Sequence, residues 1–135
     1  MVGILIIGHR NLPETFYNIL KDMNPKKLDN VDFINVFPED NIEKIRDIIA
    51  KKIKKINKGD GVLILTDMFG GTPSNLSLTF LNEGEVEVVT GINLPMLLKL
   101  LFIRDEYSLL ELSKFIANYG TRNICIASKL MEGDF

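Results

Sequence analysis

Short runs of β-branched residues and leucines alternate with longer stretches of helical periodicity, and this alternation constrains the possible fold more than any other feature of the chain. The runs over 2–7, 31–37 and 62–65 are rich in strand-forming residues, as strands of a buried sheet are. Apolar residues three or four positions apart lie between them, as in amphipathic helices. A repeated order of strand and helix predicts an α/β fold with a parallel sheet and right-handed crossovers.

The second half of the chain continues this pattern and then departs from it. A strand is expected over 85–90, and two helices follow over 94–103 and 108–119. A last short strand is expected over 123–128, and its position after two helices leaves open whether it is antiparallel. We therefore expect one domain over 1–130, with a tail over 131–135, built on a doubly wound sheet of strand order 2-1-3-4.

Composition and charge exclude several classes of protein. Lysine and arginine number 16 and aspartate and glutamate number 18, so the net charge of −2 argues against a nucleic-acid binder. One cysteine and one histidine rule out a disulfide framework and the metal motifs that need two such residues. No apolar run approaches the roughly 20 residues of a membrane span, and the apolar start lacks a basic leader, so we expect a cytoplasmic protein.

The only histidine, His9, follows the first expected strand, and Asp67 follows the third. Ligands of open α/β sheets bind beyond the carboxyl ends of the strands, where the strand order reverses. In the order 2-1-3-4 these two strands are neighbours about 4.8 Å apart, so His9 and Asp67 are expected to face each other. A carboxylate on one ring nitrogen leaves the other nitrogen with a free lone pair, which makes it a nucleophile.

The segment after Asp67 has features of an anion-binding loop. Gly70 and Gly71 allow close backbone approach, and a helix is expected to start behind them with Thr72 as its N-cap. The hydroxyls of Thr72 and Ser74 are candidate donors to a phosphate, although an ordinary strand-to-helix turn has the same pattern. No P-loop or G-x-G-x-x-G motif is present. A nucleophilic histidine beside an anion loop suggests phosphoryl transfer through a phosphohistidine, without a cofactor or a metal.

Three stretches, taken in order, resemble a known family. They are Ile6–His9, Leu65–Asn75 and Thr90–Leu97, and the resemblance extends, in order and length, over nearly the whole chain. They are similar to the enzyme IIA domain of the mannose family of the bacterial sugar phosphotransferase system, and the second stretch is the most specific.

This resemblance implies a function, a site and partners. The family's phosphorylated histidine corresponds to His9 and its carboxylate partner to Asp67, while the phosphate loop corresponds to Gly70, Gly71, Thr72 and Ser74. The phosphoryl group would come from the phosphocarrier HPr and go to a cognate enzyme IIB, with the membrane components involved only indirectly. The family also implies a homodimer in which a C-terminal antiparallel strand, here Asn123–Ser128, is exchanged between subunits.

Three residues near the expected site leave alternatives open. The family commonly has glycine after the histidine and serine or threonine before it, whereas this chain has Arg10 and Gly8. Arg10 either binds the phosphoryl group or an acidic partner, or is a solvated side chain. Asn93, in the loop after the fourth expected strand, is a second candidate contact.

Other functions remain possible at this stage. One is a regulatory or dihydroxyacetone-kinase-type phosphocarrier of the same fold, and another is a non-catalytic interaction module with an inert His9. An FMN binder is a third, although the chain has no tryptophan and only three tyrosines to stack on a flavin.

Overall fold

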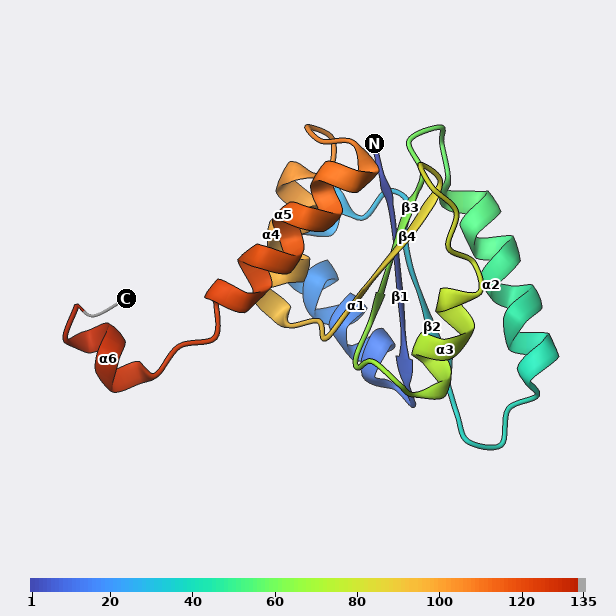
Figure 1. The fold of residues 1–135 in the computed structure, drawn as a ribbon, viewed down its shortest axis with the longest axis horizontal. Helices are drawn as coiled ribbons and strands as arrows, with labels where there is room; N and C mark the ends of the chain where they lie inside the picture. Colours follow the sequence, from blue (N-terminus) through green and yellow to red (C-terminus); the bar gives the residue numbers. More distant parts are fainter. Residues whose placement is uncertain (134–135) are drawn as a thin grey trace.

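Four parallel strands form a single sheet in the computed structural model, which describes residues 1–133 (Figure 1). The strands are β1 (Gly3–His9), β2 (Val31–Val36), β3 (Val62–Thr66) and β4 (Val86–Thr90). They lie in the order β2-β1-β3-β4, and every pair of neighbours is parallel. The expected α/β class and strand order are therefore confirmed.

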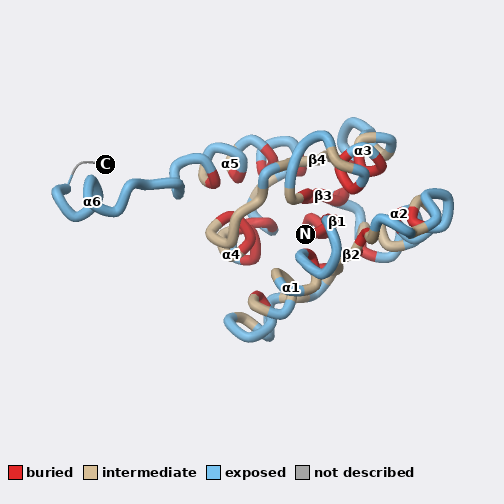
Figure 2. The backbone as a smooth tube through the Cα atoms, turned by 90° about the horizontal axis from the view of Figure 1, so that it is seen from below, coloured by how far each residue is buried: buried red, intermediate tan, exposed pale blue. Residues whose placement is uncertain are grey.

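Helices cover both faces of the sheet (Figures 1 and 2). One face packs against α1 (Leu12–Met23), α4 (Leu94–Ile103) and α5 (Leu109–Arg122). The opposite face packs against α2 (Ile42–Ile56) and α3 (Thr72–Leu78). A 3₁₀ turn, η1 (Pro25–Lys27), precedes β2, and a short helix, α6 (Ala127–Met131), follows α5.

The two central strands are buried on both faces, which explains their continuous apolar sequence. In β1, Ile4 and Ile6 belong to the core under α1, α4 and α5, while Leu5 and Ile7 belong to the core under α2 and α3. Successive side chains of a strand point to opposite faces, so each layer receives every second residue. This arrangement sets the register of β1 against β3 and fixes where both strands end.

The strand order reverses between β1 and β3. From β1 the chain crosses over through α1 to β2, whereas the connection from β3 to β4 contains α3 on the other face of the sheet. The loops after β1 and β3 consequently lead to opposite faces and leave a crevice at the carboxyl ends of the strands. His9 and Asp67 lie at this crevice.

A buried arginine, which the sequence pattern did not indicate, ties the end of α4 to the start of the sheet. Arg104 is only 2% exposed, and its guanidinium donates hydrogen bonds to the carbonyl oxygens of Val2, Lys27 and Asp29. A buried cation needs such acceptors, because removal of the charge from water is costly. Arg104 thus stabilises the loop that leads into β2.

The strand expected over Asn123–Ser128 is not formed in the single chain. After α5 the backbone runs without regular structure to α6, and this segment extends away from the sheet (Figure 1). Ile124 is 77% exposed and Ile126 is 69% exposed. A strand needs a neighbouring backbone to satisfy its N–H and C=O groups, and no strand within residues 1–133 pairs with this segment. Residues 134 and 135 of the expected tail lie outside the described residues, and α6 crosses its expected start.

Candidate functional site

His9 and Asp67 form a hydrogen-bonded pair at the carboxyl ends of β1 and β3. His9 is the last residue of β1 and its side chain is 46% exposed, while the Asp67 side chain, directly after β3, is 12% exposed. The ring nitrogen Nδ1 of His9 lies 2.8 Å from Oδ2 of Asp67. The structure thus brings together the two residues that the sequence placed at neighbouring strand ends.

Backbone groups hold the carboxylate of Asp67 in place. Its Oδ2 also accepts the backbone N–H of His9 at 2.9 Å, and Oδ1 accepts the N–H of Met68 at 3.0 Å. Gly8 leaves the space for this arrangement, because a Cβ at that position would lie 3.1 Å from both Cγ of Asp67 and Cγ of Pro13. Glycine at position 8, where the family commonly has serine or threonine, therefore allows the Asp67 carboxylate to lie close to the backbone.

The surroundings of Asp67 keep its carboxyl group ionised. Burial acts to raise its pKa, but the hydrogen bonds from His9 and Met68 and the charge of the His9 ring together outweigh burial, so the pKa is lowered. An ionised carboxylate only accepts hydrogen bonds, so Nδ1 of His9 carries the proton. In the neutral ring, which carries one proton, the other nitrogen, Nε2, then keeps its lone pair.

The backbone of Gly71 lies against the Nε2 edge of the His9 ring. A Cβ on Gly71 would come within 2.5 Å of Cε1 and 2.8 Å of Nε2, so only glycine leaves this edge open. Gly70 turns the chain with a φ of +98°, which glycine adopts without strain. The expected loop over Gly70 and Gly71 therefore lies beside Nε2 of His9.

The expected N-cap of α3 is displaced by one residue. Thr72 is already the first residue of the helix, and Gly71, with extended φ and ψ of −91° and 171°, is the N-cap. The chain therefore enters the helix one residue earlier than the Thr-Pro pattern suggested, and Pro73 is the second helical residue. Proline is tolerated there because the first N–H groups of a helix have no intrahelical acceptor.

A pocket of about 360 Å³ opens beside His9. Arg10 and Thr72 line it together with His9, and the loop from β2 to α2 contributes a mainly apolar wall. That wall consists of Val36, Phe37, Pro38, Asp40, Ile42 and Ile45, while Pro73 and Leu76 come from α3. The sequence pattern did not indicate this apolar wall.

Ser74 and Asn93 are predicted site residues that do not line this pocket. Ser74 is fully buried, and within residues 1–133 its Oγ has no hydrogen-bond partner. It is the third residue of α3, and burial keeps its hydroxyl from the surface of the crevice. Asn93 caps α4 instead, since its Oδ1 accepts the N–H of Met96 at 3.1 Å and its Nδ2 donates to the carbonyl of Gly120 at 3.1 Å.

Arg10 adopts a backbone conformation that is unusual for its residue type. Its φ is +52°, in the left-handed region, and its N–H donates to the carbonyl of Val36 at 2.8 Å. The side chain is exposed. No acidic group within residues 1–133 forms an ion pair with it.

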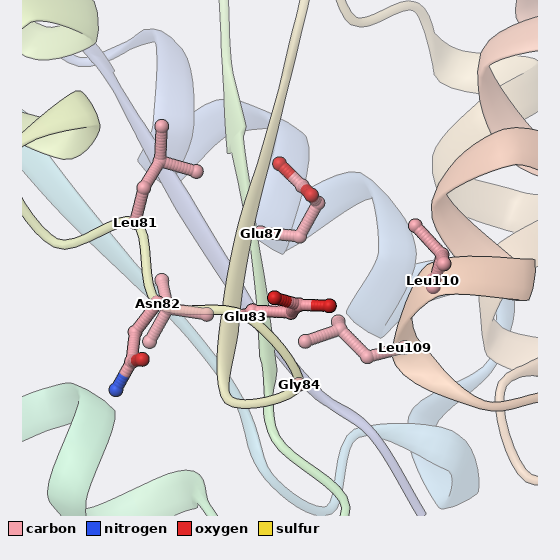
Figure 3. Close-up of a pocket in the computed structure, with 8 residues that line it drawn as sticks. Leu81, Asn82, Glu83, Gly84, Glu87, Leu109 and Leu110 are labelled. Carbon is pink, nitrogen blue, oxygen red and sulfur yellow. The ribbon is translucent and has the colours of Figure 1, made fainter.

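A second hollow, of about 370 Å³, lies at the other end of the sheet (Figure 3). It is formed where the chain enters β4, and Figure 3 shows Glu83 and Glu87 near Leu109 and Leu110 at the start of α5. Its lining, among the described residues, contains no histidine and no cation. The pair of a histidine and a carboxylate therefore marks the pocket beside His9 as the candidate site.

The lowered pKa of Asp67 predicts a pH-dependent contribution to stability. We expect Asp67→Asn to reduce the free energy of unfolding at pH 7, because the ionised carboxylate is favoured in the folded state. That contribution is complete above about pH 4, the pKa of an unperturbed aspartate, and is lost as the pH falls through the lower pKa of the folded protein. Urea unfolding of both proteins at pH 7 and pH 3 would check this, and an equal difference at the two pH values would contradict it.

Membrane-spanning and metal-binding features are both absent from residues 1–133. No helix there has both the length and the apolar character needed to cross a membrane. No cluster of three or more histidine, cysteine, aspartate or glutamate side chains is arranged to hold a metal ion in this part of the chain.

Comparisons with known proteins agree on one family. The family model described as "PTS system fructose IIA component" matches residues 3–117. A fructose-specific EIIA component of Bacillus subtilis is 27% identical over 137 aligned positions, which cover 98% of this chain and 90% of that protein. The mannose-specific EIIAB component of Escherichia coli is 34% identical over 79 positions, which cover 58% of this chain and only 24% of that longer protein.

A solved structure supports the fold. The phosphotransferase system component EIIA from Streptococcus agalactiae superposes with a TM-score of 0.85 at 23% identity, over 96% of this chain and 99% of that one. Together with the family match over most of the sequence, this places the chain in the EIIA-man family of phosphotransferase system IIA components.

Proposed function

We propose that this chain is a phosphocarrier that accepts a phosphoryl group from phospho-HPr on His9 and passes it to a cognate enzyme IIB. The observation that carries the proposal is the hydrogen bond between Nδ1 of His9 and Asp67, which leaves Nε2 as a free nucleophile beside an open pocket. HPr and enzyme IIB are the partners that family membership implies. Such a protein would work in the cytoplasm and reach the membrane components only through enzyme IIB.

The transfer step needs no proton movement at His9. The lone pair of Nε2 attacks the phosphorus atom, and the new N–P bond forms as the bond between phosphorus and the donor atom of phospho-HPr breaks. The electron pair of the broken bond stays on the donor. The proton on Nδ1 remains in place, so the phosphorylated ring gains a positive charge that faces the Asp67 carboxylate. Transfer to enzyme IIB is the reverse of this step.

The surface around His9 suits transient contact with a partner protein. Met68 and Phe69, directly after Asp67, are 53% and 70% exposed, and the pocket beside His9 has an apolar wall. Exposed apolar residues at a crevice are typical of an interaction site. Because catalysis here would consist of positioning and charge stabilisation, partner contact would supply much of the alignment.

We also propose that the segment after α5 pairs with a second copy of the chain. The outer edge of β4 has no neighbouring strand within residues 1–133, and Ile124 and Ile126 are largely exposed. Exposed edges and apolar arms of this kind are aggregation-prone unless they are covered. An exchanged strand over 123–128 would cover the outer edge of β4 and bury the two exposed isoleucines. It would be antiparallel to β4, as the family resemblance implies.

Phosphorylation of His9 is directly testable. Incubation with phosphoenolpyruvate, enzyme I and HPr is expected to add one acid-labile phosphoryl group, seen by intact mass. We expect His9→Ala to abolish this labelling and Asp67→Asn to slow it, because a neutral amide would no longer stabilise the cationic ring. Full labelling of His9→Ala would refute the site assignment. An enzyme IIA known to be labelled in the same mixture serves as the positive control.

The open edge of the His9 ring gives a second test. We expect Gly71→Ala to slow phosphorylation at least about 10-fold, because the added methyl group would push the ring away from its position. Gly70→Ala is the matched control, since a Cβ there meets nothing within 4 Å. It strains the turn but leaves Nε2 open. Equal rates for the two variants would show that the close approach at Gly71 has no role.

The proposed dimer depends on the arm after α5. Light scattering coupled to gel filtration is expected to give a dimer for the full chain and a monomer for a chain that ends at Arg122. Removal of residues 132–135 alone is the control and should leave the dimer intact. A monomeric full chain, or a dimer that survives loss of the whole arm, would contradict strand exchange.

A further inference from the structure

We propose that the guanidinium group of Arg10 binds the phosphoryl group carried by His9. This inference rests on the proposed function, because it needs a phosphorylated His9. It makes Arg10 a phosphoryl-binding residue at a position where the family commonly has glycine. The backbone, the surroundings of the side chain and the charge balance of the site each support it.

The backbone at Arg10 is held in a conformation that costs free energy for any residue with a Cβ. Its φ of +52° is in the left-handed region, which glycine adopts freely and which arginine adopts only under constraint. The constraint is visible, since the N–H of Arg10 donates to the carbonyl of Val36 at the end of β2. Strained non-glycine residues of this kind cluster at functional sites, where the side chain offsets the cost.

The side chain of Arg10 is free to bind a ligand. It is exposed, and within the described part of the chain it forms no ion pair. It lines the pocket beside His9, together with Thr72, and is the only arginine or lysine in that lining. The one carboxylate of the lining, Asp40, is engaged with its own loop, because its Oδ2 accepts the N–H of Phe37 at 2.8 Å.

The charge balance of the phosphorylated site favours a cation. A phosphoryl group brings close to two negative charges into a crevice where Asp67 is already ionised. The protonated ring offsets only part of this charge. A guanidinium presents two parallel N–H groups to phosphoryl oxygens, and such a bidentate contact is among the strongest polar interactions in proteins. Arg10, the residue next to His9, is placed to supply it.

Nuclear magnetic resonance of the isolated phosphoprotein tests the contact without any partner present. We expect the Nε–H signal of Arg10, assigned by its loss in Arg10→Gly, to shift on phosphorylation of His9 and to exchange several-fold more slowly with water. Arg122, exposed at the end of α5, is the matched control and should not change. An Arg10 signal that is identical in the two forms would overturn the proposal.

Kinetics supply the second test. Arg10→Gly is expected to slow transfer from phospho-HPr about 10-fold or more, and Arg10→Lys to recover part of the rate, because lysine keeps the charge and loses the planar fork. Arg10→Gly should unfold at a temperature no lower than that of the wild type, since glycine relieves the strain. A slower rate with no change of the Arg10 signal would overturn phosphoryl binding in favour of partner docking.

These outcomes are distinct from failure of the proposed function. If the wild-type chain took up no phosphoryl group, or took it up elsewhere than on His9, the proposed function itself would be wrong. If the wild type were labelled on His9 while Arg10→Gly reacted at the same rate, only the role of Arg10 would be wrong.

Discussion

The hydrogen bond between His9 and Asp67 depends on the order of the strands and in turn explains the local sequence around it. It exists because β1 and β3 are parallel neighbours whose carboxyl ends lie side by side at the point where the sheet reverses its order. Cores on both faces of the sheet fix the register of these strands, so packing far from the pair brings the two side chains within hydrogen-bond distance. The chemistry of the ring then follows from which nitrogen the carboxylate holds.

Glycines on either side of the pair are explained by the same constraint. Gly8 leaves room for the carboxylate, and Gly71 leaves room for the Nε2 edge of the ring. At both positions the limit is a close approach by another group, since neither has a positive φ. Arg10 is the opposite case, because its backbone favours glycine while its side chain has open space. Close approach thus accounts for two small residues, and the proposed contact with a phosphoryl group would account for Arg10, the large residue at a position where the family commonly has glycine.

The sequence predicted the parts of the structure that depend on strand order and strand ends. Periodicity located the four strands, and their ends identified His9, Asp67 and the glycine loop, because the carboxyl ends of parallel strands share one edge. The sequence did not predict the features of the site that depend on where an individual side chain lies. Ser74 and Asn93 follow the ends of the right strands, but Ser74 is buried within α3, and Asn93 caps α4. Nothing in the local pattern around Arg104 indicates that its acceptors lie far away in sequence.

The expected last strand is not formed in the single chain, for a related reason. Alternating apolar residues indicate that a segment pairs with a sheet, but they do not say which chain supplies the neighbouring strand. Ile124 and Ile126 have the composition of a buried strand and the exposure of an unpaired one. In a second copy of this chain, β4 likewise has no neighbouring strand on its outer edge within residues 1–133. Intermolecular pairing would therefore reconcile the strand-forming sequence of this segment with its irregular conformation in one chain.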